Sequence, residues 1–96
     1  MLYALICIDK PNASALRAEA RPRHLAYIEA RMAEVRIAGP FVSDDGKTML
    51  GSLIIIEAAD ADAARAFSAA DPYTQAGLFQ SVDIRPWRWT IGVPKE

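Results

Sequence analysis

The chain has little cysteine and histidine, with one of each among its 96 residues, Cys7 and His24. A lone cysteine cannot form an internal disulfide, and one thiol with one imidazole is a poor start for a zinc site. Glycine-rich phosphate loops are absent, and Asp44-Asp45-Gly46 is too short for a calcium loop. We therefore expect no metal and no cofactor.

Neither sign of charge is in excess, because 11 Lys and Arg stand against 12 Asp and Glu and the formal net charge is -1. A protein that binds nucleic acid normally carries a basic face that neutralises phosphates. An RNA-binding domain also needs exposed aromatic residues on its central strands, a requirement that Tyr3 alone does not meet. We expect no nucleic-acid partner.

Long apolar runs are missing as well. The first, Leu2–Ile8, has seven residues and stops at Asp9-Lys10-Pro11, which is too short for a membrane span and unlike a signal peptide. We expect no membrane association, and the single thiol suits a reducing compartment, here the cytoplasm. A length of 96 residues fits one domain and leaves no room for two, so we expect a single domain over residues 1–96. Its 52% of hydrophobic residues is enough to build a core.

Four segments have the length and composition of β-strands. Tyr3–Ile8 and Thr48–Glu57 are apolar on both faces, which is typical of strands buried on two sides. An Asp-Gly turn joins the second of these to a short strand over Phe41–Asp44. The last predicted strand, Phe79–Ile91, contains Pro86 and therefore favours the edge of a sheet.

The segment from Ser14 to Ala38 has helical periodicity, with an interruption at Pro22. Because proline fits the first turn of a helix but breaks an interior, we predict a short helical turn and then a long helix that starts at Pro22. Its core-facing stripe consists of apolar residues at helical spacing: Leu25, Ile28, Met32 and Val35. Ala38-Gly39-Pro40 predicts its end.

A second helix is predicted over Ala61–Ala70, with Asp60 as its N-cap. Its small inner face permits close approach to a sheet and consists of Ala63, Phe67 and Ala70. Asp71-Pro72 then opens a short turn that runs through Gly77.

The element order is strand, helix, strand, strand, helix, strand, which predicts an α+β fold with ferredoxin-like βαββαβ topology and an antiparallel four-stranded sheet. In this fold the first and third strands are central, as their two apolar faces require. The helices cover one face of the sheet only, and no other segment is left to cover the second. We therefore expect a homodimer, the alternative being a monomer with an open apolar face.

His24 is the first candidate for chemistry, since its side chain alone titrates near neutrality and it borders the apolar stripe. The alternative is a surface histidine or a core histidine with satisfied hydrogen bonds. Asp71 is the second candidate, although Asp-Pro before a helical turn is ordinary capping chemistry. Both roles are compatible, because one carboxylate has several lone pairs.

Arg21 and Arg23 flank the histidine and are candidates for holding an anionic substrate at a helix start. The alternative is that both are solvated charges. Cys7 lies in a predicted central strand, where a small core residue is expected rather than a nucleophile.

The run Arg21-Pro22-Arg23-His24-Leu25 resembles the YciI-like family (YCII-related domain), and Ala38-Gly39-Pro40, Asp71-Pro72-Tyr73, Ala76-Gly77 and Pro86 continue the resemblance along nearly the whole chain. The resemblance implies a dimeric α+β barrel, in which two ferredoxin-like sheets face each other. It also implies an active-site dyad that falls on His24 and Asp71. Tyr73 joins Arg21 and Arg23 as an expected substrate-binding residue.

Some members of that family look like lyases that eliminate halide from chlorinated hydroxyquinols. The resemblance thus implies a cofactor-independent lyase or isomerase that moves protons on a small aromatic or lactone-like molecule, with His24 as base or acid and Asp71 as its partner. The alternative is a non-catalytic dimeric module that binds a small molecule or accompanies another protein.

Overall fold

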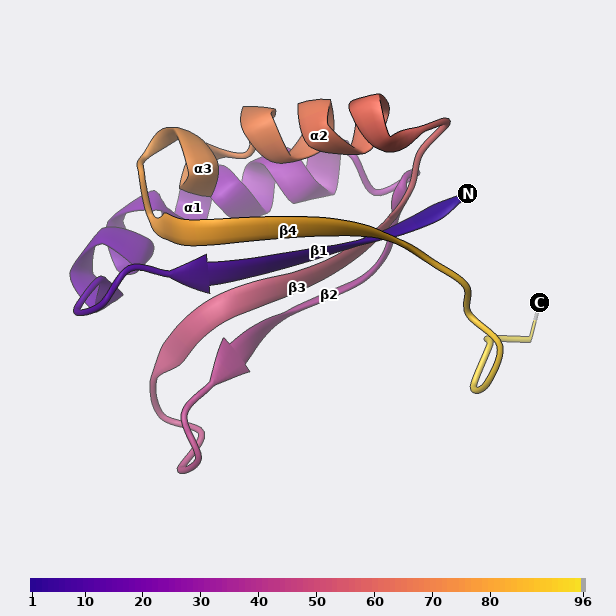
Figure 1. The fold of residues 1–96 in the computed structure, drawn as a ribbon. Coiled ribbons are helices and arrows are strands. Elements are labelled where there is room, and N and C mark those ends of the chain that lie inside the picture. The colour runs from indigo at the N-terminus through magenta and orange to yellow at the C-terminus, as the bar shows by residue number, and fades with distance from the viewer. Residues whose placement is uncertain (96) are drawn as a thin grey trace.

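Four strands form one antiparallel sheet, and three helices lie on one of its faces (Figure 1). This computed structural model describes residues 1–95. Its elements in chain order are β1 (Leu2–Asp9), α1 (Ser14–Ala30), β2 (Val35–Val42), β3 (Met49–Glu57), α2 (Ala61–Ala70), α3 (Pro72–Gln75) and β4 (Phe79–Trp87). The sheet order β2-β3-β1-β4 puts β1 and β3 in the centre, so the predicted ferredoxin-like fold is confirmed.

The core lies between the sheet and the helices. Side chains alternate along each strand, so Tyr3, Leu5 and Cys7 of β1 point towards the helices beside Ile54 and Ile56 of β3. From the helix layer, Ala64 and Phe67 of α2 complete this cluster. Burying each large apolar side chain stabilises the fold by about 1.5–3 kcal/mol, which holds α2 firmly on the sheet.

The predicted break at Pro22 is wrong, because α1 runs unbroken from Ser14 to Ala30 with Pro22 inside it. Pro22 removes one backbone donor, and the carbonyl that would have accepted it belongs to Ala18. Both residues are exposed, so water can bond to that carbonyl and one helical bond is lost without ending the helix. His24 therefore lies in the middle of α1, not in its first turn.

The predicted helix end at Ala38 is also wrong, because α1 ends at Ala30 and β2 runs from Val35 to Val42. Val35 and Ile37 are β-branched, which favours a strand. The strand also tolerates Gly39-Pro40, because β2 lies at the edge of the sheet. The hairpin turn at Asp45-Gly46 is confirmed, with Gly46 at a φ of 76°.

The predicted apolar stripe is only partly buried. Leu25 and Met32 are 45% and 55% exposed, Val35 lies in a strand, and the buried residues of α1 are Arg17, Ala20 and His24. All four predicted stripe residues nevertheless line one cavity between α1 and the sheet. The periodicity thus identified residues that share one cavity, although only Leu25 and Ile28 belong to α1. Val35 is also part of the core cluster, and Ile28 packs against that cluster.

The predicted cap of α2 is confirmed, since the Asp60 side chain accepts a hydrogen bond from the Ala63 backbone at 2.8 Å. Its buried face differs from the prediction by about one position and comprises Ala64, Phe67 and Ser68. β4 ends at Trp87 rather than Ile91, and Pro86 lies in it as an edge strand, as expected.

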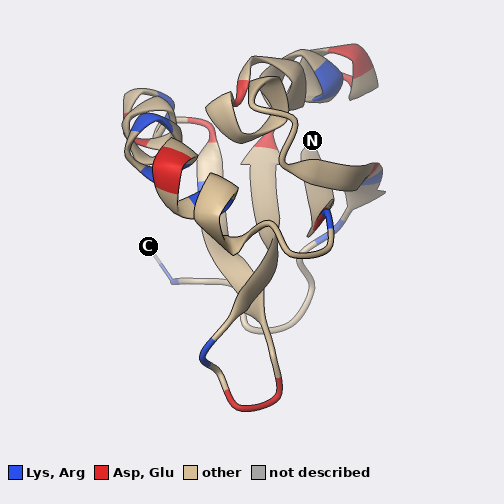
Figure 2. Ribbon diagram, turned by 90° about the vertical axis from the view of Figure 1, so that its left-hand side faces the viewer, with Lys and Arg blue, Asp and Glu red and all other residues tan. Residues whose placement is uncertain are grey.

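Among residues 1–95, no helix covers the sheet face opposite α1, α2 and α3 (Figure 1). Ile8 and Ile37 on this face are 42% and 45% exposed. Acidic and basic residues are interspersed along the helices on the side that Figure 2 shows. No helix within residues 1–95 has the length and apolar character to cross a membrane.

Candidate active site

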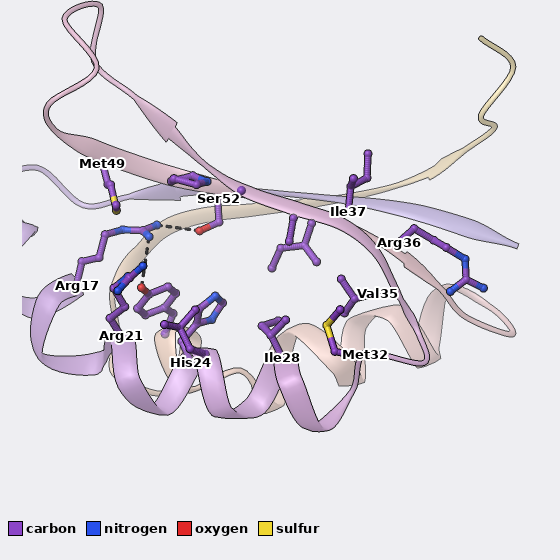
Figure 3. A pocket seen from close by; sticks show the side chains of 16 residues that line it. Arg17, Arg21, His24, Ile28, Met32, Val35, Arg36, Ile37, Met49 and Ser52 are labelled. Atoms are coloured by element: carbon purple, nitrogen blue, oxygen red, sulfur yellow. Dashed lines mark hydrogen bonds between the residues drawn. The ribbon is translucent and has the colours of Figure 1, made fainter. Parts of the chain in front are cut away.

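A cavity of about 460 Å³ lies between α1 and the β2–β3 side of the sheet (Figure 3). One end is polar and is lined by Arg17, Arg21, His24, Ser52 and Tyr73. The other end is apolar and is lined chiefly by Leu25, Ile28, Met32, Val35 and Ile54. Such a volume, mostly apolar with a few convergent polar groups, suits a small organic molecule.

The structure brings His24 and Asp71 together, with Nδ1 of the imidazole 2.8 Å from Oδ1 of the carboxylate. His24 is 9% exposed and Asp71 is 2% exposed, so water screens this pair little. A carboxylate accepts hydrogen bonds, which assigns the proton of the neutral imidazole to Nδ1. The other nitrogen, Nε2, has no hydrogen bond within residues 1–95 and carries a free lone pair at the cavity.

Asp71 also caps α3, because the same Oδ1 accepts the backbone N–H of Tyr73 at 2.9 Å. Pro72 follows at the first helical position, where its missing N–H costs nothing. One carboxylate oxygen therefore both caps α3 and bonds the imidazole of His24. The cap fixes the carboxylate, and the carboxylate fixes the ring.

Tyr73 packs flat on His24, with the ring centroids 3.9 Å apart and the planes 14° from parallel. Phe79 supports Tyr73 edge-on at 5.9 Å. Burial raises the pKa of the Tyr73 hydroxyl, although the charges of Arg17 and Arg21 act in the opposite direction. Tyr73 thus holds the imidazole in one orientation and remains neutral at physiological pH.

Arg17 is a buried part of the site that the sequence analysis missed. Its guanidinium bonds Asp9 through Nε at 2.8 Å and Nη2 at 3.2 Å, and Nη2 also donates to the Ser52 hydroxyl at 2.8 Å. It also lies 4.6 Å from the centre of the Tyr73 ring. Burial lowers the Arg17 pKa, but its hydrogen bonds and Coulombic attraction to Asp9 outweigh that effect and raise it overall.

A sequence signal for Arg17 did exist. Arg17, Arg21 and His24 are spaced by four and three residues, which places them on one face of a continuous helix. The assumed break at Pro22 separated Arg17 from His24 and concealed that face.

Arg21 and Arg23 have different environments. Arg21 lines the cavity, and no carboxylate within residues 1–95 pairs with it. Arg23 instead forms an exposed ion pair with Glu19 at 3.0 Å and does not line the cavity. Neither residue lies at a helix N-terminus, since α1 begins at Ser14.

Cys7 faces the core and is 1% exposed. Burial, with a smaller contribution from the Asp71 charge, raises the pKa of the thiol to about 12. A thiol that stays protonated is a poor nucleophile, as expected for a core residue. Within the described residues, no three His, Cys, Asp or Glu side chains gather as a metal site requires.

The fold and the site define a small ferredoxin-like α+β domain whose helix layer and sheet enclose a cavity with a buried His–Asp pair. The chain belongs to the YCII-related domain family, whose family model matches residues 1–88. It is 34% identical over 95 residues to protein YciI of Escherichia coli, covering 92% of this chain and 97% of that protein. A protein of Haemophilus influenzae is 32% identical with the same coverage.

A solved structure supports the same assignment. It is the 5-chloro-2-hydroxyhydroquinone dehydrochlorinase TftG of Burkholderia phenoliruptrix in complex with 2,5-dihydroxybenzoquinone. The TM-score is 0.85 and the sequence identity 34%, and the match covers 92% of this chain and 94% of that one.

Proposed function

We propose that this protein is a cofactor-independent enzyme that moves protons on a small hydroxylated aromatic molecule bound beside His24. The observation that carries the proposal is the buried hydrogen bond of 2.8 Å between His24 Nδ1 and Asp71, at the polar end of a cavity of single-ring size. His24 is the general base and acid, and Asp71 orients it.

The hydrogen-bond pattern supports these roles. With its proton on Nδ1 and bonded to Asp71, the neutral imidazole offers the Nε2 lone pair to a substrate hydroxyl. When Nε2 takes that proton, the imidazolium that forms lies against a carboxylate, which stabilises it. Tyr73, stacked at 3.9 Å, keeps the ring aligned throughout.

The reaction of the solved neighbour, loss of HCl from a chlorinated hydroxyquinol, fits one proton-shuttling group. Nε2 removes the proton of the hydroxyl next to the chlorinated carbon and returns it to that carbon, which forms a ketone. The hydroxyl para to the first then loses its proton, and its electrons move through the ring as the C–Cl pair leaves with chloride. Atoms and electrons balance as hydroxyquinone plus HCl, so no external oxidant is required.

The cavity supports a flat substrate. Its apolar end accepts an aromatic ring, while Tyr73 and Arg21 line the polar end, where they contact the substrate. Arg23 does not line the cavity, and it pairs with Glu19 on the exposed side of α1. We further propose that the working unit is a homodimer, supported by the open apolar face of the sheet.

The test is chloride release and quinone absorbance with 5-chloro-2-hydroxyhydroquinone, together with NMR of hydrogen exchange into unchlorinated hydroxyquinol in D₂O. His24→Asn should lower the rate by about 10²–10⁴-fold, the usual contribution of a general acid-base group. Asp71→Asn keeps a side-chain acceptor for the α3 cap but loses the charge, and should lower it by on the order of 10²-fold. Asp62→Asn removes an exposed carboxylate elsewhere and should change nothing.

A wild-type protein that neither releases chloride nor exchanges ring protons above the uncatalysed rate would contradict the enzyme proposal. If the same protein still bound hydroxyquinol, the alternative of a non-catalytic binding module would take its place. Equal rates for His24→Asn and wild type would show that the imidazole is structural.

A further inference from the structure

We propose that Ser52 and Arg21 form a two-point binding site for an oxygen anion of the substrate, which makes an ionised hydroxylated aromatic the preferred ligand. This proposal rests on the proposed function, because the ligand occupies the same cavity. It adds the charge state of the ligand and the residues that bind the charged oxygen.

The Ser52 hydroxyl is held with its oxygen already in use. Ser52 is 4% exposed on the helix-facing side of β3, and its oxygen accepts a hydrogen bond from Arg17 Nη2 at 2.8 Å (Figure 3). Its own proton has no acceptor within residues 1–95, and Ser52 lines the cavity. A hydroxyl that accepts a bond from a cation is polarised and donates more strongly, so an oxygen anion is its best partner.

The positive charge at this end of the cavity exceeds the available negative charge. Asp9 is engaged by two hydrogen bonds from Arg17, and Asp71 is engaged by His24 and by the backbone of Tyr73. Arg21 is left without a counterion inside the described part of the chain, and its side chain points to the same end as Arg17 (Figure 3). A bound anion would complete this charge balance.

The two donors come from opposite walls. Arg21 projects from α1, three residues before His24 on the same helical face, and Ser52 projects from β3 across the cavity. An oxygen held between them places the attached ring along the apolar end, close to the imidazole. This orientation presents a neighbouring hydroxyl or ring carbon to Nε2.

Calorimetric titration separates an anion site from a generic aromatic pocket. The probes are 2,5-dihydroxybenzoquinone, whose hydroxyls ionise as vinylogous acids, and its dimethyl ether, which has the same ring without the charge. We expect wild type to bind the anion at least about tenfold more tightly than the ether, as one charge-assisted hydrogen bond allows.

Variants then identify the two donors. Arg21→Gln and Ser52→Ala should each weaken binding of the anion by about tenfold and leave the ether unchanged. Ser52→Thr keeps the hydroxyl and should restore binding to within about threefold of wild type. Arg23→Gln, a matched loss of charge two residues from Arg21 but outside the cavity, should leave both affinities unchanged.

Equal affinity for the anion and the ether, or no binding of the anion by wild type, would overturn the proposal. So would an Arg23→Gln effect as large as that of Arg21→Gln. If Ser52→Ala does not fold by circular dichroism, Arg21→Gln and Ser52→Thr still decide the outcome. His24→Asn should retain anion binding while it loses proton transfer, so failure of the catalytic proposal is distinguishable from failure of this one.

Discussion

Asp71 is a residue whose local and long-range roles reinforce each other. Its Oδ1 caps a helix of only four residues and at the same time accepts from an imidazole 47 positions earlier in the chain. Removing the cap would release both the start of α3 and the orientation of His24. A side chain with two bonds to fixed groups is a more rigid partner for the proposed base than a free surface carboxylate.

Cys7 allows a pH prediction with a defined sign. Its pKa rises from 9.0 to about 12 on folding, so the folded protein holds this proton more tightly than the unfolded chain does. The corresponding stability is complete below pH 9 and is lost as the pH rises towards 12, by about 1.4 kcal/mol per pH unit. Denaturant titrations of wild type and Cys7→Ala over this range should show a flatter pH profile for the variant.

The native thiol should also resist a disulfide reagent at pH 8 and react fully once urea unfolds the chain. Rapid labelling of the native protein, or identical alkaline profiles for wild type and Cys7→Ala, would contradict the buried, protonated thiol.

At this scale the sequence was informative where a residue was unique or had a strong local role. His24 is the single histidine, and Asp71-Pro72 is a capping signature, so both could be named without a structure. Their contact could not, because it depends on how α1 and α3 meet. Arg17 was overlooked because burial of an arginine is rare and depends on partners at Asp9 and Ser52, which lie on two different strands.

Among the elements, α1 determines the shape of the site. Arg17, Ala20 and His24 of this helix are buried. Leu25 of the helix and Met32 of the turn that follows it remain exposed on the cavity side. Tyr27 ties the helix to α2 through a hydrogen bond to the Phe67 carbonyl at 2.7 Å. The helix is thereby held at a distance from β2, and this gap is the cavity.

The strand order was predictable because composition distinguishes central from edge strands, whereas the end of α1 was not. Val35 continues the helical spacing of Ile28 and Met32, so periodicity alone extends the helix into what is β2. The strand forms because its backbone pairs with β3, with Val35 opposite Ile56. That pairing is tertiary and overrides the local pattern.

Two glycines of the sheet make a matched test of strand packing. A Cβ at Gly51 of β3 would lie 2.2 Å from the Cys7 backbone carbonyl oxygen of β1, whereas a Cβ at Gly39 of β2 would meet nothing within 4 Å. Gly51→Ala should therefore destabilise the protein by about 1–3 kcal/mol or more, since a backbone carbonyl must move. Gly39→Ala should be close to neutral.

Chemical denaturation of the two variants measures this difference directly. Equal unfolding free energies for Gly51→Ala and Gly39→Ala would mean that β1 and β3 do not approach as closely at Cys7 as the structure has them.

For the molecule as a whole, the helices leave one face of the sheet without cover. The alternating positions of β1, β2 and β3 place apolar residues on this face: Ile6, Ile8, Ile37 and Leu53, around Ile55, which its neighbours already bury. On β4 the same face carries Asp83 and Arg85, an ion pair at 2.8 Å. An apolar centre with a polar margin is the composition of a protein interface, and a two-fold axis would let the face pair with itself.

If the protein is the homodimer that we propose, its mass in solution should be that of two chains and should depend on Ile8. Light scattering at micromolar concentration should give about twice the chain mass of 10.5 kDa. Ile8→Lys should shift this towards a monomer, because it places a charge among the exposed apolar side chains of the proposed interface. Leu25→Lys is the matched control, with a similar exposure of 45% on the helix side, and should leave the mass unchanged. Both substituted positions are exposed in the single chain, so circular dichroism should show an intact fold for each variant. A wild-type mass of one chain, or dissociation by Leu25→Lys and not by Ile8→Lys, would contradict pairing through the open face and leave that face as exposed apolar surface.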